Sequence, residues 1–291
     1  MALPLISVIV VVNNQSNFVE QALESVARQT YRNIETIVID NGSVDNTADL
    51  AHRFINRHMP NAILVRCANR EAYSTINQGI RLARGDYFNL LNSADCFSSN
   101  RIERCIYAIE RTASELIFTD VDFVDLDGCK YPDTKYISSW RDAKNSINEH
   151  PTLGFALMEN QLAISSANFF VSSRLHQMVG DFRQYRYNSD WDYILRSLFY
   201  TEPVFLSFPG YICRFGIYDS AERSEHIVTY ETTEVMRNFI WLMTSKRPLN
   251  IRAPSPFCWP GVFERVVKKM SYEQYMPPRL REKFDGTEWI S

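Results

Sequence analysis

The sequence predicts an α/β fold: a doubly wound, mostly parallel central sheet followed by a helical C-terminal extension. A continuous β-branched run at Ile6–Val12 is typical of a strand that is covered on both faces. Strand-like and helix-like stretches then alternate over the first 113 residues, which favours parallel strands joined by helices. A chain of 291 residues that is 45% apolar can bury the core of one large α/β domain with an appendage.

The elements of this first part follow from apolar spacing and from flanking residues. After the first strand, Val19, Leu23 and Val26 recur at helical spacing, and Asn17 with Glu20 forms a capping-box pattern. The pattern then predicts, in order, a strand at 35–39, a helix from a Ser43 cap to about residue 56, a strand at 62–65, a helix over 76–83 that stops at Gly85, a strand at 87–91 and a helix over 102–109.

The alternation of strand-like and helix-like stretches weakens beyond about residue 114. Leu116–Val124 is strand-like and ends in an Asp-Leu-Asp-Gly turn at 125–128, which is a hairpin signal. Residues 132–150 have no clear periodicity, so we expect this segment to be a mobile loop over the functional site. The other expected elements are a strand at 168–171, a helix from Asp190 to about Tyr200, short strands near 203–207 and 211–215, and a long helix at 223–245.

The composition and the net charge limit which binding partners and which cellular compartment we expect for the protein. The formal net charge is -3, so nothing global indicates a nucleic-acid partner. Six cysteines without a CxxC pair favour reduced thiols in a cytoplasmic protein over a disulfide framework or a zinc site. The apolar N-terminus has no basic n-region and no cleavage site, and its apolar run is too short to span a bilayer.

Polar side chains follow the first two predicted strands at the point where each strand ends. Asn13 and Asn14 follow the first strand, and Asp40 and Asn41 follow the second. Ligands of open α/β sheets bind in the crevice at the carboxyl ends of the strands, and an Asn amide can read the edge of a base. The alternative is that these residues only cap helices and turn the chain. Their place at adjacent strand ends favours the site.

A second polar cluster, Asn92-Ser93-Ala94-Asp95, follows the strand at 87–91. Asp95 is the only carboxylate in the cluster. One carboxylate, a diphosphate and waters can together hold Mg2+ or Mn2+, so the cluster suggests a nucleotide-diphosphate site. The alternative is that Asp95 caps the helix that begins near Asn100.

A third candidate is the pair Asp190 and Asp192 in the segment RYNSDWDYILRSL, at the predicted start of a helix. The helix macrodipole favours the ionised form of an Asp at this position. An ionised carboxylate that faces a pocket can take a proton from an acceptor hydroxyl. The alternative is simple helix capping.

The C-terminal tail is basic and aromatic. Between Lys246 and Lys283, nine basic residues stand against three acidic ones, with Phe, Trp and Tyr side chains interleaved. Such a segment can lie on an anionic membrane surface, which would make the protein peripheral at the inner face of the cell membrane. It can equally be an arm that packs on the main domain and keeps a solvated basic face.

Four segments, in this order, resemble family 2 glycosyltransferases of the GT-A fold: SVIVVVNN, ALESVARQTYRNIETIVIDNGSVDNT, NQGIRLARGDYFNLLNSAD and VGDFRQYRYNSDWDYILRSL. The likeness runs from about residue 5 to residue 214. NSDWDYILRSL and APSPFCWPGVF also resemble bacterial polysaccharide-assembly members. The resemblance implies a GT-A catalytic domain over 1–215, with a nucleotide-binding half at about 1–113 and an acceptor half at about 114–215, and a helical extension over 216–291.

The resemblance implies inverting transfer from a nucleotide-diphosphate sugar, most often a UDP-sugar in this family, to a hydroxyl of a glycan or lipid-linked glycan. Asp190 would be the general base, and Mg2+ or Mn2+ at Asp95 would neutralise the leaving diphosphate. Carried over by position, the donor contacts would be Val11 and Asn13 beside the base, Asp40 and Asn41 at the base and ribose, Asn69 and Arg70 near the nucleotide, and Asn92 and Ser93 in the Asp-x-Asp motif.

The chain departs from the family pattern at several of these positions. Val11-Val12-Asn13-Asn14 stands in place of Pro-Thr-Tyr-Asn, and Asn41 in place of the second Asp of an Asp-Asp pair. Ser189 stands in place of the Glu that usually precedes the base. Ala94 occupies the usual metal-binding position, although relatives with an Asn-x-Gly-Asp motif imply that Asp95 can serve.

Two other functions therefore stay open. One is a catalytically degenerate GT-A domain that binds a nucleotide sugar or a partner without turnover, and Ala94 favours it. The other is a nucleotidyltransferase that makes sugar nucleotides. That class needs a Gly-rich, basic loop after the first strand, and residues 13–17 are neither.

Overall fold

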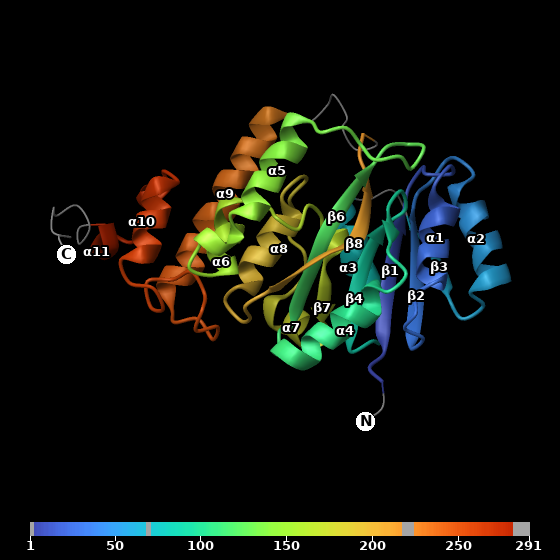
Figure 1. The fold of residues 1–291 in the computed structure, drawn as a ribbon, viewed down its shortest axis with the longest axis horizontal. Helices are drawn as coiled ribbons and strands as arrows, with labels where there is room; N and C mark the ends of the chain where they lie inside the picture. The colour runs from blue at the N-terminus through green and yellow to red at the C-terminus, as the bar shows by residue number, and fades with distance from the viewer. Residues whose placement is uncertain (1–2, 68–70, 217–223, 282–291) are drawn as a thin grey trace.

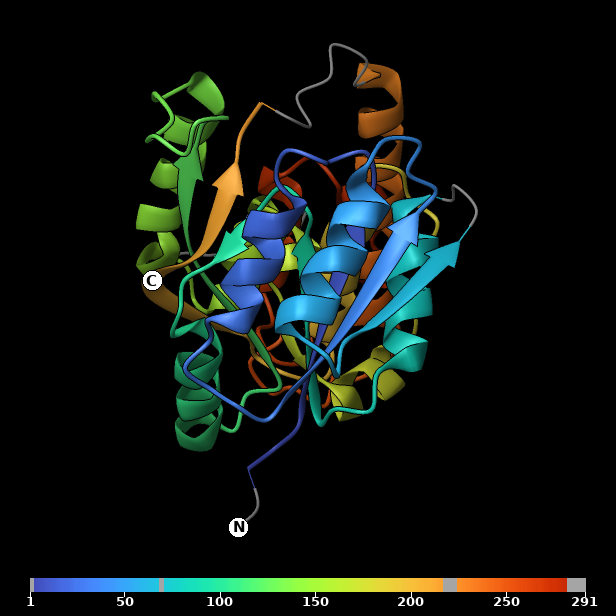
Figure 2. The ribbon, with the colours of Figure 1, turned by 90° about the vertical axis from the view of Figure 1, so that its right-hand side faces the viewer.

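The computed structural model describes residues 3–67, 71–216 and 224–281. Within these ranges eight strands form one sheet in the order β3-β2-β1-β4-β7-β6-β8-β5, with helices on both faces (Figures 1 and 2). The strands are β1 (Ile6–Val12), β2 (Ile34–Asn41), β3 (Ile63–Cys67), β4 (Tyr87–Asn92), β5 (Cys96–Phe97), β6 (Leu116–Val124), β7 (Phe170–Ser172) and β8 (Val204–Arg214). The predicted α/β class with a mostly parallel sheet is confirmed.

Helices connect and cover these strands. The α-helices are α1 (Val19–Ala27), α2 (Thr47–His58), α3 (Ala72–Leu82), α4 (Arg101–Thr112), α5 (Lys135–Asn145), α6 (Leu153–Glu159), α7 (Ser173–Val179), α8 (Ser189–Ser197), α9 (Glu225–Ser245), α10 (Val262–Lys269) and α11 (Pro278–Arg281). Short 3-10 helices are η1 (Ile147–Glu149), η2 (Ser166–Asn168) and η3 (Glu273–Tyr275).

The parallel register of β1 with its two neighbours gathers the predicted polar strand ends at one edge of the sheet. Val12 of β1 lies opposite Asp40 of β2, and Val11 lies opposite Asn92 of β4. Parallel strands end on the same side, so these polar residues lie along the same edge of the sheet. The sheet then changes direction, because β7 pairs antiparallel with both β4 and β6.

Both faces of the sheet are buried, which explains why β1 is apolar at every position except Ser7. Ile9 packs into the hydrophobic cluster that also holds residues of α3 and α8. Val8 and Val10 pack into the cluster on the other face, with residues of α1 and α4. Because successive residues of a strand point to opposite faces, a strand covered twice needs apolar residues on both faces.

The C-terminal helices pack into the same hydrophobic cluster as α8. Val235 and Phe239 of α9 and Phe263 and Val267 of α10 are buried there. Figure 1 shows α9 and α10 on the side of the molecule away from β3. The boundary expected near residue 215 stays a prediction. In the described parts of the chain, no helix combines the length and the apolar content needed to cross a bilayer.

The predicted loop at 132–150 is wrong, because α5 and η1 occupy most of it. Ile137 and Trp140 are buried on one face of α5, and the Trp140 indole N–H donates to the carbonyl oxygen of Leu162 at 2.9 Å. The Thr134 hydroxyl oxygen caps the helix by accepting the N–H of Ile137. Two buried side chains are too few to make a visible apolar period, so tertiary packing decides this helix.

The two short strands predicted near 203–207 and 211–215 are one strand, β8. The ladder between β6 and β8 shifts register on both sides of Asp120, which lets β8 run through Pro209 and Gly210. A Cβ atom on Gly210 would lie 2.7 Å from Thr119 Oγ1, so glycine permits the close approach of the two strands.

The predicted caps of the first two helices are also wrong. Phe18 occupies the N-cap position of α1 without a side-chain bond to the backbone. α2 begins at Thr47, and the Ser43 hydroxyl oxygen instead accepts the N–H of Asn14 at 3.1 Å. The polar residues after β1 and β2 therefore bond to each other across the two loops.

Candidate active site

A cavity of about 710 Å³ lies where the two parts of the sheet meet, at the ends of β4 and β8. It is open to solvent on one side and has both polar and apolar walls. Its polar lining combines the end of β4, the start of α8 and the end of β8: Asn92, Asp95, Ser189, Asp190, Tyr211 and Arg214. The second and third candidates from the sequence are thus brought together in one cavity.

Asp190 is placed at the cavity by the first turn of α8, which begins one residue earlier than predicted, at Ser189. Its Oδ1 accepts the N–H of Trp191 at 2.8 Å. Burial of the carboxyl group raises the pKa of Asp190 to about 6, and the bond from Trp191 opposes that rise. A carboxylate with this pKa is ionised at neutral pH and is still basic enough to accept a proton.

Asp192 has a structural role although it stands only two residues away. Its carboxylate is almost fully buried and bonds to Arg196 Nε at 2.7 Å and to Arg183 at 3.3 Å. Arg196 also donates to the carbonyl oxygens of Val179 and Asp181. The pair therefore fixes α8 against the segment before it, and of the two predicted aspartates only Asp190 lines the cavity.

Glu231 of α9 holds the segment that precedes α8, and no sequence pattern indicated this role. Its buried carboxylate accepts the backbone N–H groups of Arg186 at 2.6 Å, Tyr187 at 2.8 Å and Asn188 at 3.1 Å. Charge-assisted bonds of this kind are among the stronger hydrogen bonds in proteins. Glu231 thereby fixes the wall of the cavity that carries Arg186, Tyr187 and Asp190.

Asp95 does not cap α4, and its carboxylate is already bonded to three donors of the protein. Oδ2 accepts the Tyr211 hydroxyl and the Asn92 amide, the latter at 3.0 Å, and Oδ1 accepts the Arg214 N–H at 2.8 Å. The side chain is 1% exposed, and burial raises the pKa of Asp95. Asp95 therefore joins the end of β4 to β8 across the sheet.

These donors do not fit the divalent-cation site that we expected at Asp95. A carboxylate has about four acceptor positions, and three are used within the protein. Ala94 is 1% exposed, and its carbonyl oxygen accepts Arg214 Nε at 3.1 Å. In the described residues no group of three or more His, Cys, Asp or Glu side chains could hold a metal ion, so the expected site would depend on Asp95 as its one carboxylate. Mg2+ and Mn2+ prefer several free oxygen ligands, which this arrangement does not offer.

The residues predicted near the base lie at the ends of β1 and β2 and do not line this cavity. Asp40 Oδ1 accepts the N–H of Ser43 at 3.1 Å, and Asp40 pairs with Arg66 at 3.3 Å. The Asn13 amide donates to the carbonyl oxygen of Asn41 at 2.7 Å. The sheet order puts Asp40 two strands from Asn92, on the far side of β1.

The alternative interpretation, in which these polar residues turn the chain, holds for part of these loops. Asn14 has a left-handed backbone with φ of 50° and its side-chain oxygen accepts the N–H of Val44 at 2.9 Å. Val11 is half-buried in β1, and Ser93 is buried with its N–H bonded to the carbonyl oxygen of Val11. Asn69 and Arg70, also predicted near the nucleotide, lie outside the described residues.

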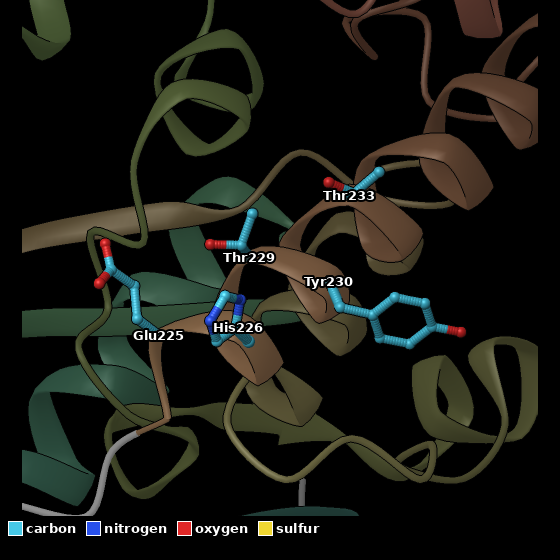
Figure 3. A pocket seen from close by; sticks show the side chains of 5 residues that line it. All are labelled: Glu225, His226, Thr229, Tyr230 and Thr233. Carbon is cyan, nitrogen blue, oxygen red and sulfur yellow. The ribbon is translucent and has the colours of Figure 1, made fainter.

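A second hollow of about 560 Å³ runs along the first turns of α9 (Figure 3). Side chains of this one helix line it: Glu225, His226, Thr229, Tyr230 and Thr233. Glu225 and Tyr230 point in opposite directions in this view, and among the described residues no group from another element lines the hollow. We therefore place the chemistry in the cavity at Asp190.

Comparison with known proteins gives a family and several relatives. The model of the family described as Glycosyl transferase family 2 matches residues 7–197. An uncharacterized glycosyltransferase of Rickettsia prowazekii is 28% identical over 196 residues, which cover 65% of this chain and 57% of that protein. Glycosyltransferase GlyG of Streptococcus pneumoniae is 30% identical over 128 residues, covering 44% of this chain and 42% of that protein. The chain thus spans about half the length of these relatives.

Solved structures share the fold at low sequence identity. S. aureus TarS in complex with UDP has a TM-score of 0.66 and 15% identity, and the match covers 94% of this chain and 73% of that chain. The mannosyltransferase PcManGT of Pyrobaculum calidifontis, in complex with GDP-Man and Mn2+, has a TM-score of 0.60 and 14% identity over 94% of this chain and 74% of that chain. At these identities the likeness is one of fold.

Proposed function

This chain belongs to glycosyl transferase family 2 and has the GT-A fold, and from that premise we propose the reaction that it performs. It moves a sugar from a nucleotide-diphosphate sugar, preferably a UDP-sugar, to a hydroxyl of a glycan or lipid-linked glycan, with inversion at the anomeric carbon. The observation that carries the proposal is the cavity shared by Asn92, at a strand end, and the basic carboxylate of Asp190.

In this reaction Asp190 is the general base. It takes the proton of the acceptor hydroxyl while the hydroxyl oxygen attacks the anomeric carbon on the face opposite the leaving diphosphate. The pKa of about 6 supports this role, because most of the carboxylate is ionised at neutral pH. The bonds from Glu231 to the segment before α8 keep the base at the cavity wall.

The donor nucleotide lies across the ends of β1, β2 and β4. Family position assigns it the contacts predicted from the sequence: Val11, Asn13, Asp40, Asn41, Asn69, Arg70, Asn92 and Ser93. The shared edge of these strands supports this placement for the described members of the set. The UDP complex of TarS supports UDP as the nucleotide.

A binding and turnover screen tests the proposed function. We expect UDP at a hundredfold excess over its Kd to raise the melting temperature of the full chain by about 5 °C, because binding to the folded state adds about 2.7 kcal/mol of stability. Uridine, which lacks the diphosphate, is the matched control and should have a much smaller effect. The measurement is a thermal-shift series over nucleoside diphosphates, each with MnCl2 and with EDTA.

Hydrolysis of the corresponding nucleotide sugars distinguishes an active transferase from a catalytically degenerate domain. We expect slow release of sugar from one donor of a broad panel, measured by chromatography. Binding of a nucleoside diphosphate with no release from any donor would favour the catalytically degenerate domain, which Ala94 suggests. Absence of any binding by the wild-type chain would reject a nucleotide-sugar site altogether.

We also propose that the protein contacts the cytoplasmic face of a membrane through a patch at the end of α9. Trp241, Leu249 and Ile251 are 67%, 69% and 77% exposed in this patch. Lys246, Arg247 and Arg252 are exposed among them. Exposed apolar side chains with neighbouring cations are typical of segments that bind anionic lipid surfaces.

Sedimentation with vesicles tests this contact. We expect the wild-type chain to bind phosphatidylglycerol vesicles and to bind phosphatidylcholine vesicles weakly, and the double substitution Leu249→Ser with Ile251→Ser to lower the bound fraction severalfold. Leu126→Ser is the control, because Leu126 is also exposed but lies in the turn after β6. Equal sedimentation of both vesicle types, or no change in the double variant, would remove the patch as a membrane contact.

A further inference from the structure

Three cationic side chains line the cavity at Asp190 within the described chain: Lys135, Arg186 and Arg214. They come from three different elements, the start of α5, the segment before α8 and the end of β8. The two carboxylates in the lining are Asp95 and Asp190. The positive charge of these side chains can attract an anionic ligand to the cavity.

Arg214 is not free to bind a ligand, because the protein uses its guanidinium group. The group donates to the carbonyl oxygens of Ala94 at 3.1 Å, Asp125 at 2.8 Å and Leu126 at 2.9 Å, and to Gln21 Oε1 at 2.9 Å. It also lies 4.5 Å from the centre of the Phe18 ring. Arg214 therefore holds α1, β8 and the turn after β6 together, with Asp95 beside it.

Lys135 and Arg186 are much less engaged within the described part of the chain, where the Arg186 guanidinium carbon lies 5.4 Å from the centre of the neighbouring Tyr187 ring. Both are exposed at the cavity, and no carboxylate among the described residues lies within 4.0 Å of either head group. Their backbones are nonetheless held in place. Glu231 accepts the N–H of Arg186 at 2.6 Å, and Thr134 caps the helix in which Lys135 is the first residue. Fixed segments thus present to the cavity two cations that have no carboxylate partner among the described residues.

We propose that Lys135 and Arg186, in place of a divalent cation, bind the diphosphate of the donor and neutralise the charge that develops on it as it leaves. This inference rests on the proposed transferase function. Two observations carry it together: the carboxylate expected to bind the cation is already bonded to three protein donors, and the same cavity is lined by two cations that no described carboxylate pairs with.

The step balances without a metal ion. The bond between the acceptor oxygen and the anomeric carbon forms as the bond from that carbon to the diphosphate oxygen breaks, and the bonding electron pair stays on the diphosphate. The acceptor proton goes to Asp190. Lys135 and Arg186 stay protonated throughout and donate charge-assisted hydrogen bonds to the diphosphate oxygens.

Calorimetric titration of the full chain with UDP, or with whichever nucleoside diphosphate binds in the screen, tests the proposal. We expect the Kd of the wild-type chain to agree within about twofold between EDTA and millimolar MnCl2. Lys135→Gln and Arg186→Gln should each weaken binding by about tenfold or more, because each removes a charge-assisted bond. Both variants should bind uridine as the wild type does.

Matched controls remove a cation of the same kind outside the cavity. Lys130→Gln and Arg57→Gln should leave the Kd for UDP unchanged, since both side chains are exposed and neither lines the cavity. Melting temperatures of all four variants show whether each is folded, and these exposed positions leave the core intact. Arg186→Lys should recover part of the affinity, because it restores the charge without the forked geometry of the guanidinium group.

Two results would overturn the inference while leaving the transferase function in place. One is a tenfold or greater tightening of UDP by MnCl2, which would show that a cation completes the site. The other is wild-type affinity for UDP in both variants. If those variants instead raise the KM for an acceptor that carries a phosphate group, the two cations serve the acceptor and not the donor. A wild-type chain that binds no nucleoside diphosphate would reject the function and the inference together.

Discussion

Asp190→Asn is expected to lower the rate of sugar transfer by about 10²–10⁴-fold while leaving the Kd for the donor nucleotide within about twofold. The amide has nearly the same shape as the carboxylate but cannot take the proton of the acceptor hydroxyl. Its oxygen can still accept the N–H of Trp191, so the first turn of α8 should be retained. Steady-state kinetics and calorimetric titration of the variant measure the two effects separately.

The pH dependence of the wild-type rate gives a second readout of the same group. Burial raises the pKa of Asp190 to about 6, and the base acts only when it is ionised. The rate should therefore rise with pH through about 6 and become level above it, and this rise should be lost from the residual activity of Asp190→Asn.

Asp181→Asn is the matched control for this substitution. Asp181 is exposed and lies in the segment before α8, outside the cavity lining. It should keep both the rate and the pH profile of the wild type. Full activity of Asp190→Asn, or a rate that falls as pH rises through 6, would show that another group takes the proton.

Arg101→Leu is expected to lower the free energy of unfolding by about 3–5 kcal/mol. Arg101 is 0% exposed, and its guanidinium group donates to Asn89 Oδ1 at 3.0 Å, Thr119 Oγ1 at 2.6 Å, Asn168 Oδ1 at 3.0 Å and the Asn168 carbonyl oxygen at 2.7 Å. These bonds join α4 to β4, β6 and η2. Leucine fills much of the space but removes one donor from each of the buried side chains of Asn89, Thr119 and Asn168, of which Asn168 still accepts from Thr119.

Urea denaturation of the wild-type and variant chains measures this loss. Arg104→Leu is the control on the same helix: Arg104 is exposed, and its guanidinium carbon lies 3.7 Å from the centre of the Phe208 ring. Loss of this contact should cost about 1 kcal/mol or less. An Arg101→Leu chain as stable as Arg104→Leu would mean that the buried network contributes little to folding.

Much of the fold could be predicted because the relevant signals are local. β1 and β6 have the predicted bounds, since each is rich in β-branched and aromatic residues and is followed by polar residues. The helices from α1 to α4 were predicted within a few residues from apolar spacing. The predicted caps of α1 and α2 were wrong. For α2 the reason is that Ser43 bonds to the loop after β1, and a contact between distant loops leaves no local pattern.

The site was predicted less completely, since similar residues in one segment have different surroundings. The sequence does not distinguish Asp190 from Asp192, because both are aspartates at the start of the same helix. In the structure Asp192 is bonded to Arg196, whereas Asp190 lines the cavity. No sequence pattern indicated the roles of Arg101 and Glu231, although Arg101 bonds to the sheet and Glu231 bonds to the cavity wall. A charged residue in an amphipathic helix is ordinarily solvent-facing, so its burial cannot be inferred from spacing.

The sequence by itself determined the alternation of strands and helices, the polar strand ends and the family motif, because these depend on side-chain periodicity and on residue identity over short stretches. Only the tertiary structure decided the direction in which each polar side chain points. Asp95 turns toward Tyr211 and Arg214, more than a hundred residues further along the chain, while Lys135 and Arg186 line the cavity without a carboxylate partner in the described parts of the chain. Partners so distant along the chain meet only when the sheet is assembled, so the balance of charge in the cavity is a property of the fold.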